Sequence, residues 1–211
     1  MKDVLAAGAR ILSAREADAL GERAALPVAH GRPTLLGDAV LDPILPPLQL
    51  VVCGASPDAG AMVAAGLRQG WRVDVVDPRR SFLVEGRFPG ARLLDAEPGQ
   101  AGAASGAGEW SAAMVMSHDY LRDAAFVGGF LGRGLAYLGV LGPRDRTDRL
   151  LAELEVTPSD ADRAALHAPA GLDVGADGAE QVATSIVAEI LAVLHGRGGG
   201  PLRERGGSIH G

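Results

Sequence analysis

Residues 50–80, LVVCGASPDAGAMVAAGLRQGWRVDVVDPRR, decide the fold of this chain. An apolar run ends at Gly54, a segment with helical spacing follows, and a second apolar run ends at Asp77. This order of strand, turn, helix and strand is the outline of a dinucleotide-binding unit, in which an acid follows the turn by about 20 residues and binds a ribose. We therefore expect a nucleotide-like ligand near this turn.

The turn departs from the usual glycine pattern. Ser56 and Ala59 stand where the second and third glycines are expected, so Ser56 adds a side chain where the backbone normally approaches a pyrophosphate. Asp58 places a negative charge at the start of the helix, where it repels a phosphate but suits an uncharged ligand group or a helix cap. Two interpretations remain from spacing alone: a modified nucleotide site, or a turn that only resembles one.

Short apolar runs and helical segments continue to alternate down the chain. Further strands are expected at 91–95, 112–117 and 135–142, and helices at 119–131, 145–154, 159–166 and 179–194. Such alternation predicts a three-layer, doubly wound Rossmann-like α/β domain with a mostly parallel sheet over residues 49–196, whose ligands bind beyond the carboxyl ends of the strands. Residues 1–48 are expected to form a short helical extension and linker, 98–112 a surface loop, and 197–211 a flexible glycine-rich tail.

Composition excludes several classes of protein. A formal charge of −6 and a pI near 5.3 argue against a protein that follows nucleic-acid phosphates. The single cysteine, Cys53, cannot form an intramolecular disulfide, which fits a reducing cytoplasm. Charged residues interrupt the first 20 positions, so neither a signal peptide nor a membrane span is expected there. We expect a cytoplasmic protein without nucleic-acid or membrane partners.

Four blocks of sequence, in order, carry a family resemblance: VVDPRR…GRFPGARLL (75–94), MSHDYLRD (116–123), YLGVLGPRDRTDRLLAEL (137–154) and HAPAGLDVGADGAEQVATSIVAEILA (167–192). The series resembles the carboxyl-terminal Rossmann-like domain of the xanthine dehydrogenase accessory protein family, the XdhC/CoxI type, over roughly residues 48–194. The resemblance implies a maturation factor, not itself an enzyme, that binds the molybdenum cofactor as molybdopterin or its cytosine dinucleotide. Such a factor protects the cofactor during sulfuration and delivers it to a molybdenum hydroxylase of the xanthine dehydrogenase type.

The amino-terminal region departs from the family pattern. Typical members carry a substantial amino-terminal domain with its own glycine- and cysteine-containing motif, whereas about fifty residues precede the Rossmann-like part here. We therefore expect this domain to be shortened or absent. The partners implied are a molybdenum hydroxylase apo-enzyme and a cysteine desulfurase. A homodimer is a further hypothesis, because an apolar helix face in the leader would gain from a partner surface.

The candidate cofactor-binding residues near the turn follow from the dinucleotide outline. Gly54 permits the turn, Ser56 and Asp58 border it, Asp77 is the ribose-binding acid, and Arg79 is placed to attract a nucleotide phosphate.

Later strand ends supply the other candidates. His118 can donate to phosphate or pterin oxygens, with the alternative that Asp119 caps a helix and His118 packs against it. Arg144 can grip a phosphate, or form a surface ion pair. Gly171, Asp173 and Gly175 form a loop before the last helix. Its amides can converge on an anion, and Asp173 can accept from a pterin or ribose or else pin the loop.

Three hypotheses remain open at this level. The first is a cofactor chaperone, the second an NAD(P)-binding oxidoreductase, and the third a scaffold whose nucleotide site has decayed. Neither a spaced metal-ligand cluster nor a nucleophile motif is found in the sequence, which favours the first.

Overall fold

The computed structural model describes residues 34–36, 39–41, 46–154 and 156–206. The chain divides into two compact units, Met1–Pro46 and Pro47–Gly211. In the first unit, β1 (Thr34–Leu36) pairs antiparallel with β2 (Ala39–Leu41), a strand pair that the sequence pattern did not predict. The helix predicted near the start of the chain lies outside the described residues.

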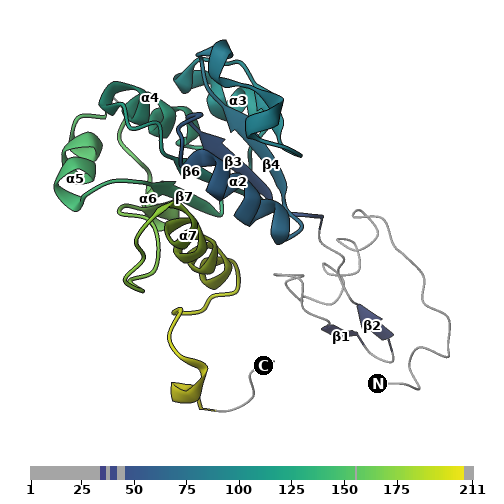
Figure 1. Cartoon of the computed structure of the whole chain (residues 1–211). Coiled ribbons are helices and arrows are strands. Elements are labelled where there is room, and N and C mark those ends of the chain that lie inside the picture. The colour runs from purple at the N-terminus through teal and green to yellow at the C-terminus, as the bar shows by residue number, and fades with distance from the viewer. Residues whose placement is uncertain (1–33, 37–38, 42–45, 155, 207–211) are drawn as a thin grey trace. The chain divides into compact units, whose positions relative to one another are not determined.

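The second unit is built on a six-stranded sheet in which every pairing is parallel (Figure 1). Its strand order is β5-β4-β3-β6-β7-β8. The strands are β3 (Gln49–Cys53), β4 (Arg72–Val76), β5 (Arg92–Leu94), β6 (Ser111–Val115), β7 (Tyr137–Val140) and β8 (Leu166–His167). This is the strand order of the doubly wound dinucleotide-binding fold.

Alternation along β3 explains why both faces of the sheet are covered. Leu50 and Val52 belong to the hydrophobic core on one face, and Val51 and Cys53 belong to the core on the other. All four side chains are fully buried. Since successive strand residues point to opposite faces, a continuous apolar run signals a strand buried on both sides.

Helices complete the three layers. The helix α2 (Ala59–Arg68) packs against α7 (Ala179–Leu194), and residues of both contribute to the first core. The second core takes residues from α3 (Ala101–Ser105), α4 (Tyr120–Phe130) and α5 (Arg144–Ala152). The short α6 (Asp160–Ala165) leads into β8, and single 3-10 turns lie at η2 (Arg80–Phe82), η3 (Glu85–Arg87), η4 (Pro98–Gln100) and η5 (Leu202–Glu204). The predicted Rossmann-like fold is confirmed.

One local prediction was wrong, and one strand was missed. Residues 98–112 were expected to be a surface loop, but they contain η4 and α3, and Ala101 and Gly102 are buried. A side chain at Gly102 would collide with the carbonyl oxygen of Gly129 in α4, at 2.4 Å, so this glycine allows two backbones to approach. The sixth strand, β8, was not predicted, because the helical segment expected at 159–166 ends at Ala165.

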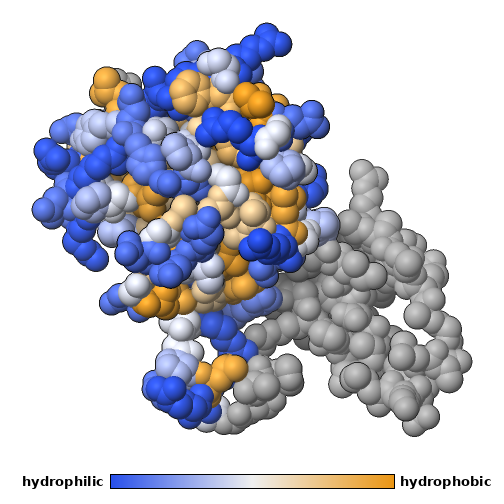
Figure 2. Space-filling model, viewed as in Figure 1, coloured by the Kyte–Doolittle hydropathy of each residue, from blue (hydrophilic) through white to orange (hydrophobic). Residues whose placement is uncertain are grey.

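The surface carries apolar and charged residues interspersed, as the face seen in Figure 2 shows. Among the described residues, the exposed large apolar side chains are Phe82, Val84, Leu121, Val156, Val174 and Leu202. Of the helices in the described part of the chain, none is both long enough and apolar enough to span a bilayer.

Candidate functional site

The carboxyl ends of β3 and β6 meet at the centre of the sheet. The chain leaves β3 toward β4 and β5 on one side and then returns to β6 on the other, which makes this pair of strands the topological switch point. In open α/β sheets, ligands bind in the crevice outside such a point. The loops that follow β3 and β6 therefore form the candidate site.

Gly54 lets these two loops approach each other. Its φ of +101° lies in a region that other residues rarely adopt, and a Cβ at this position would lie 2.5 Å from the Cα of Ser117. Gly54 thus fits the predicted tight turn, and the close contact with the loop after β6 adds a second requirement for glycine. The amide of Gly54 also donates to the carbonyl of Val76, which ties the turn to β4.

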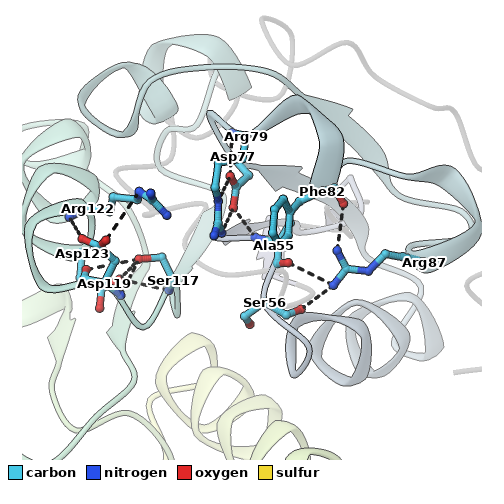
Figure 3. A network of polar contacts seen from close by, with 10 residues as sticks. All are labelled: Ala55, Ser56, Asp77, Arg79, Phe82, Arg87, Ser117, Asp119, Arg122 and Asp123. Carbon is cyan, nitrogen blue, oxygen red and sulfur yellow. Dashed lines mark hydrogen bonds and ion pairs between the residues drawn. The ribbon is translucent and has the colours of Figure 1, made fainter.

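The carboxylate of Asp77 is already engaged within the protein (Figure 3). It is 1% exposed and accepts from the amide of Ala55 at 2.7 Å, from the amide of Arg79 at 2.8 Å, and from Nε and Nη2 of the Arg79 guanidinium at 2.9 and 2.8 Å. Burial disfavours the charged carboxylate, but these hydrogen bonds outweigh it, so the pKa of Asp77 is lowered from its usual value. A ribose at this acid would have to displace Arg79.

Arg87 fixes the other side of the turn. Its Nη2 donates to the carbonyl oxygens of Ala55 and Ser56 at 3.1 and 3.2 Å, and its Nη1 donates to that of Phe82. Two side chains thus hold the turn: Asp77 accepts from a backbone amide of the turn, and Arg87 donates to two of its carbonyl oxygens. The spacing of residues in the sequence gives no indication of this contact.

Ser56 has a buried hydroxyl without a protein partner among the described residues. The residue is 5% exposed, and its Oγ makes no hydrogen bond to them. In Figure 3 the Ser56 side chain points away from Arg87. Since buried hydroxyls nearly always find a partner, an orphaned one in a ligand-binding turn marks a position where a ligand group fits.

Asp58 and His118 meet across the crevice. Asp58 precedes α2 but makes no cap hydrogen bond, and instead its Oδ2 lies 3.1 Å from Nε2 of His118. Both side chains are about half exposed, so His118 is not packed against α4. His118 has a φ of +60°, a conformation that is uncommon outside glycine and often found at functional sites.

Asp123 of α4 holds the loop after β6 through hydrogen bonds to Ser117. This fully buried carboxylate accepts from the amide and hydroxyl of Ser117 at 3.0 and 2.6 Å and pairs with Arg146 at 2.6 Å. Asp119 caps α4 by accepting from the amide of Arg122 at 3.0 Å, as its structural alternative predicted. Asp123 was not singled out from sequence, since its place in the helix pattern gives no sign of burial.

A cavity of about 260 Å³ opens between α2 and α7, beside this crevice. Asp58 is its one charged lining residue among those described, and the others are Met62, Met116, Leu141, Gly178, Ala179, Val182, Ala183 and Ile186. Its wall comes from the starts of both helices and from residues just past β6 and β7. The cavity therefore suits an apolar or flat ring with a polar edge toward Asp58.

The remaining predicted residues lie outside this cavity. Arg144 is exposed at the first position of α5, and its guanidinium has no partner in the described part of the chain. Asp173 and Gly175 are exposed in the loop before α7, and Asp173 forms no hydrogen bond to the described residues that would pin that loop. The amide of Gly171 donates to Glu189 at 2.8 Å, so it is not available to an anion.

The structure places Gly54, Ser56, Asp58, Asp77, Arg79 and His118 around the turn after β3, and in the described part of the chain no hydrogen bond joins this group to Gly171, Asp173 or Gly175. The last three belong to a loop that contacts the side of α7, where Glu189 also accepts from the Tyr137 hydroxyl at 2.6 Å. Within the described residues, no three histidine, cysteine or acidic side chains are grouped so as to hold a metal ion.

Comparison with known proteins places this chain in a family. The model of the XdhC Rossmann domain matches residues 50–190, which include all six strands of the sheet except the first residue of β3. The chain belongs to the XdhC family. This finding confirms the resemblance seen in the sequence blocks.

Individual XdhC relatives agree with this assignment. The chain is 34% identical over 149 residues to a Bacillus subtilis protein described as a probable xanthine dehydrogenase subunit, covering 70% of this chain and 43% of that protein. It is 30% identical over 155 residues to the uncharacterized protein YqeB of Escherichia coli, covering 72% of this chain and 28% of that protein. The chain thus spans less than half the length of these relatives.

A solved structure shares the fold. The crystal structure of a xanthine dehydrogenase from Bacillus halodurans superposes with a TM-score of 0.65 at 27% identity, covering 75% of this chain and 46% of that one. The XdhC domain described above is therefore one part of a longer architecture in that protein.

Proposed function

We propose that this XdhC domain binds the molybdenum cofactor and serves as a maturation factor that delivers it to a molybdenum hydroxylase of the xanthine dehydrogenase type. The observation that carries the proposal is the family match, since it covers residues 50–190, the residues that build the crevice between β3 and β6. The Bacillus subtilis relative, whose description names xanthine dehydrogenase, supports a client of that kind.

The residues at the crevice fit such a group. The orphaned hydroxyl of Ser56 can donate to or accept from a polar edge of the ligand. The adjoining cavity is smaller than the roughly 300–1,000 Å³ of pockets that enclose a whole drug-sized ligand, so it suits one ring system. The rest of the cofactor then lies along the open crevice.

Charged side chains around the crevice have separate roles in this proposal. His118 donates to an oxygen of the ligand in exchange for its contact with Asp58, and Arg144 holds a phosphate from the end of β7. Asp77 keeps the turn in shape through Ala55 and does not contact the ligand. The cofactor supplies redox chemistry only in the client enzyme, while this chain binds and carries it.

The test is transfer of the cofactor. The chain is co-expressed with a molybdenum-cofactor pathway, purified, and mixed with a cofactor-free hydroxylase of the xanthine dehydrogenase type, whose activity is then followed. The proposal predicts that the loaded chain restores activity and that His118→Ala restores it more slowly. Equal restoration by the loaded chain and by the same chain stripped of cofactor would contradict it.

An NAD(P)-binding oxidoreductase is the second candidate, because the strand order and the acid after β4 are those of dinucleotide-binding domains. Against it, Asp77 is buried and paired with Arg79. Fluorescence titration with NADPH decides between the two: saturable binding with turnover of a carbonyl or imine substrate would favour the oxidoreductase.

A further inference from the structure

Arg79 holds a fixed position beside the turn. Two of its nitrogens donate along one edge to the carboxylate of Asp77, and its guanidinium carbon lies 4.2 Å from the centre of the Phe82 ring. One edge and one face of the planar group are therefore used by the protein. This arrangement orders the side chain before any ligand arrives, which lowers the entropy lost on binding.

Part of the Arg79 guanidinium is not engaged by the protein residues that the structure describes. The Arg79 side chain is 31% exposed, and its Nη1 group has no hydrogen-bond partner among the described residues. In the view of Figure 3, Arg79 lies between Phe82 and Arg122 of α4, toward the loop after β6. Asp119 of that loop adds to the raised pKa of Arg79, after the larger effect of Asp77.

The ring of Phe82 stacks on one face of the Arg79 guanidinium. The residue is 40% exposed although it is large and apolar, and its backbone carbonyl oxygen accepts from Arg87, which also holds the turn. The stack of Phe82 and Arg79 is thus tied to the turn through Asp77 on one side and Arg87 on the other. We call this stack the Arg79 platform.

The charge of the Arg79 platform decides what it can bind. Asp77 already neutralises the guanidinium at 2.8 Å, so little attraction is left for a phosphate. A planar guanidinium still stacks on an aromatic face, and such stacking does not need net charge on the ligand. The platform therefore favours a neutral flat ring over an anion.

We propose that the Arg79 platform is a stacking site for the base of a nucleotide, with Nη1 donating to a ring nitrogen or carbonyl oxygen of that base. The base enters the crevice between Arg79 and the start of α4. Taken with the proposed function, on which this second step rests, the platform gives the base of the dinucleotide form of the molybdenum cofactor a contact of its own, while the pterin ring occupies the cavity beside Asp58.

The experiment measures binding of CDP, ADP and inorganic pyrophosphate to the purified chain by calorimetry, with saturation-transfer NMR to locate contacts on the ligand. Base protons are expected to receive more saturation than ribose protons. Arg79→Lys keeps the charge beside Asp77 but loses the planar face, so it is expected to weaken CDP and ADP about tenfold and pyrophosphate hardly at all. Arg80→Lys, the same change at an exposed neighbour, should leave all three within about twofold.

Several outcomes would overturn the proposal. They are unchanged affinity for CDP and ADP in Arg79→Lys, saturation of ribose protons alone, or lack of any nucleotide binding by the folded wild-type chain. Phe82→Leu gives a second route if Arg79→Lys fails to fold, and it should weaken both nucleotides without affecting pyrophosphate.

The pterin content of the chain separates this inference from the proposed function. A chain that binds CDP through Arg79 but never carries pterin would refute the cofactor role and leave the base site standing. A chain that carries pterin, with nucleotide affinity indifferent to Arg79, would refute the base site alone.

Discussion

Asp77 illustrates how one residue can satisfy a pattern and yet serve another purpose. Its spacing from Gly54 predicts a ribose-binding acid, but its buried carboxylate instead holds the amide of Ala55 and the guanidinium of Arg79. The sequence could not reveal this, because an arginine two positions after an acid can turn toward it or away from it. Only the conformation of the turn shows which group the carboxylate faces.

The first prediction concerns the stability provided by Asp77. Asp77→Asn keeps the size of the side chain but loses the charge-assisted bonds to Arg79, so we expect a loss of about 1–3 kcal/mol in the free energy of unfolding at pH 7. Because folding lowers the pKa of Asp77, its contribution is present above the unfolded value of about 3.9 and is lost as the pH falls through the folded value.

Urea unfolding of both proteins at pH 7 and near pH 3 provides the measurement. The difference between wild type and Asp77→Asn should shrink at the lower pH. A difference that stays constant would mean that the carboxylate charge does not stabilise the turn.

Among the strands and helices, burial on both faces of the sheet decides which elements can be predicted from the sequence. The strands β3, β4, β5, β6 and β7 were predicted to within about two residues of their ends, because strands buried on both faces read as apolar runs. β8 was not predicted, because a two-residue strand shows no periodicity in the sequence and forms only through pairing with β7. Likewise α3 was hidden by its glycines, which were interpreted as flexibility although Gly102 serves close packing on α4.

The second prediction tests the contact between the turn and the loop after β6. Gly54→Ala adds a Cβ at 2.5 Å from Ser117 and also forces an unfavourable φ, so it should destabilise the fold by clearly more than about 1 kcal/mol. Gly70→Ala is the matched control, since Gly70 has a φ of +75° and open space around it.

Thermal unfolding of both variants separates the two effects. We expect Gly70→Ala to show the conformational strain alone and Gly54→Ala to lose considerably more stability. If both variants lost the same amount, the approach of the two loops would not depend on Gly54.

At the scale of the whole molecule, the lone cysteine lies in the centre of the sheet. Cys53 is fully buried in β3, and burial, with a smaller effect from Asp123, raises the pKa of its thiol. The third prediction follows: a thiol reagent should react with the native chain only as fast as the domain unfolds. Labelling followed across a urea series should coincide with the loss of circular dichroism, and rapid labelling in the absence of urea would contradict the buried position.

The candidate site was only partly foreseeable on this scale. The turn after β3 and His118 after β6 were proposed as parts of the site because site residues gather at strand ends of this fold. The loop of Gly171, Asp173 and Gly175 was assigned to the site from its glycines and from the family resemblance, and its role stays a prediction. The amide of Gly171 contacts Glu189 of α7. Linear spacing cannot show which loops converge.

Cofactor content tests the central claim most directly. The chain is co-expressed with a molybdenum-cofactor pathway, purified, oxidised and assayed for fluorescent pterin, beside His118→Ala and a control, His195→Ala. His195 is an exposed histidine just past the end of α7, about 13 Å along the helix axis beyond Ile186, the last residue of α7 that lines the cavity. The account predicts near-stoichiometric pterin in the wild type and in His195→Ala, and a several-fold loss in His118→Ala. Folded wild-type protein without pterin would contradict it.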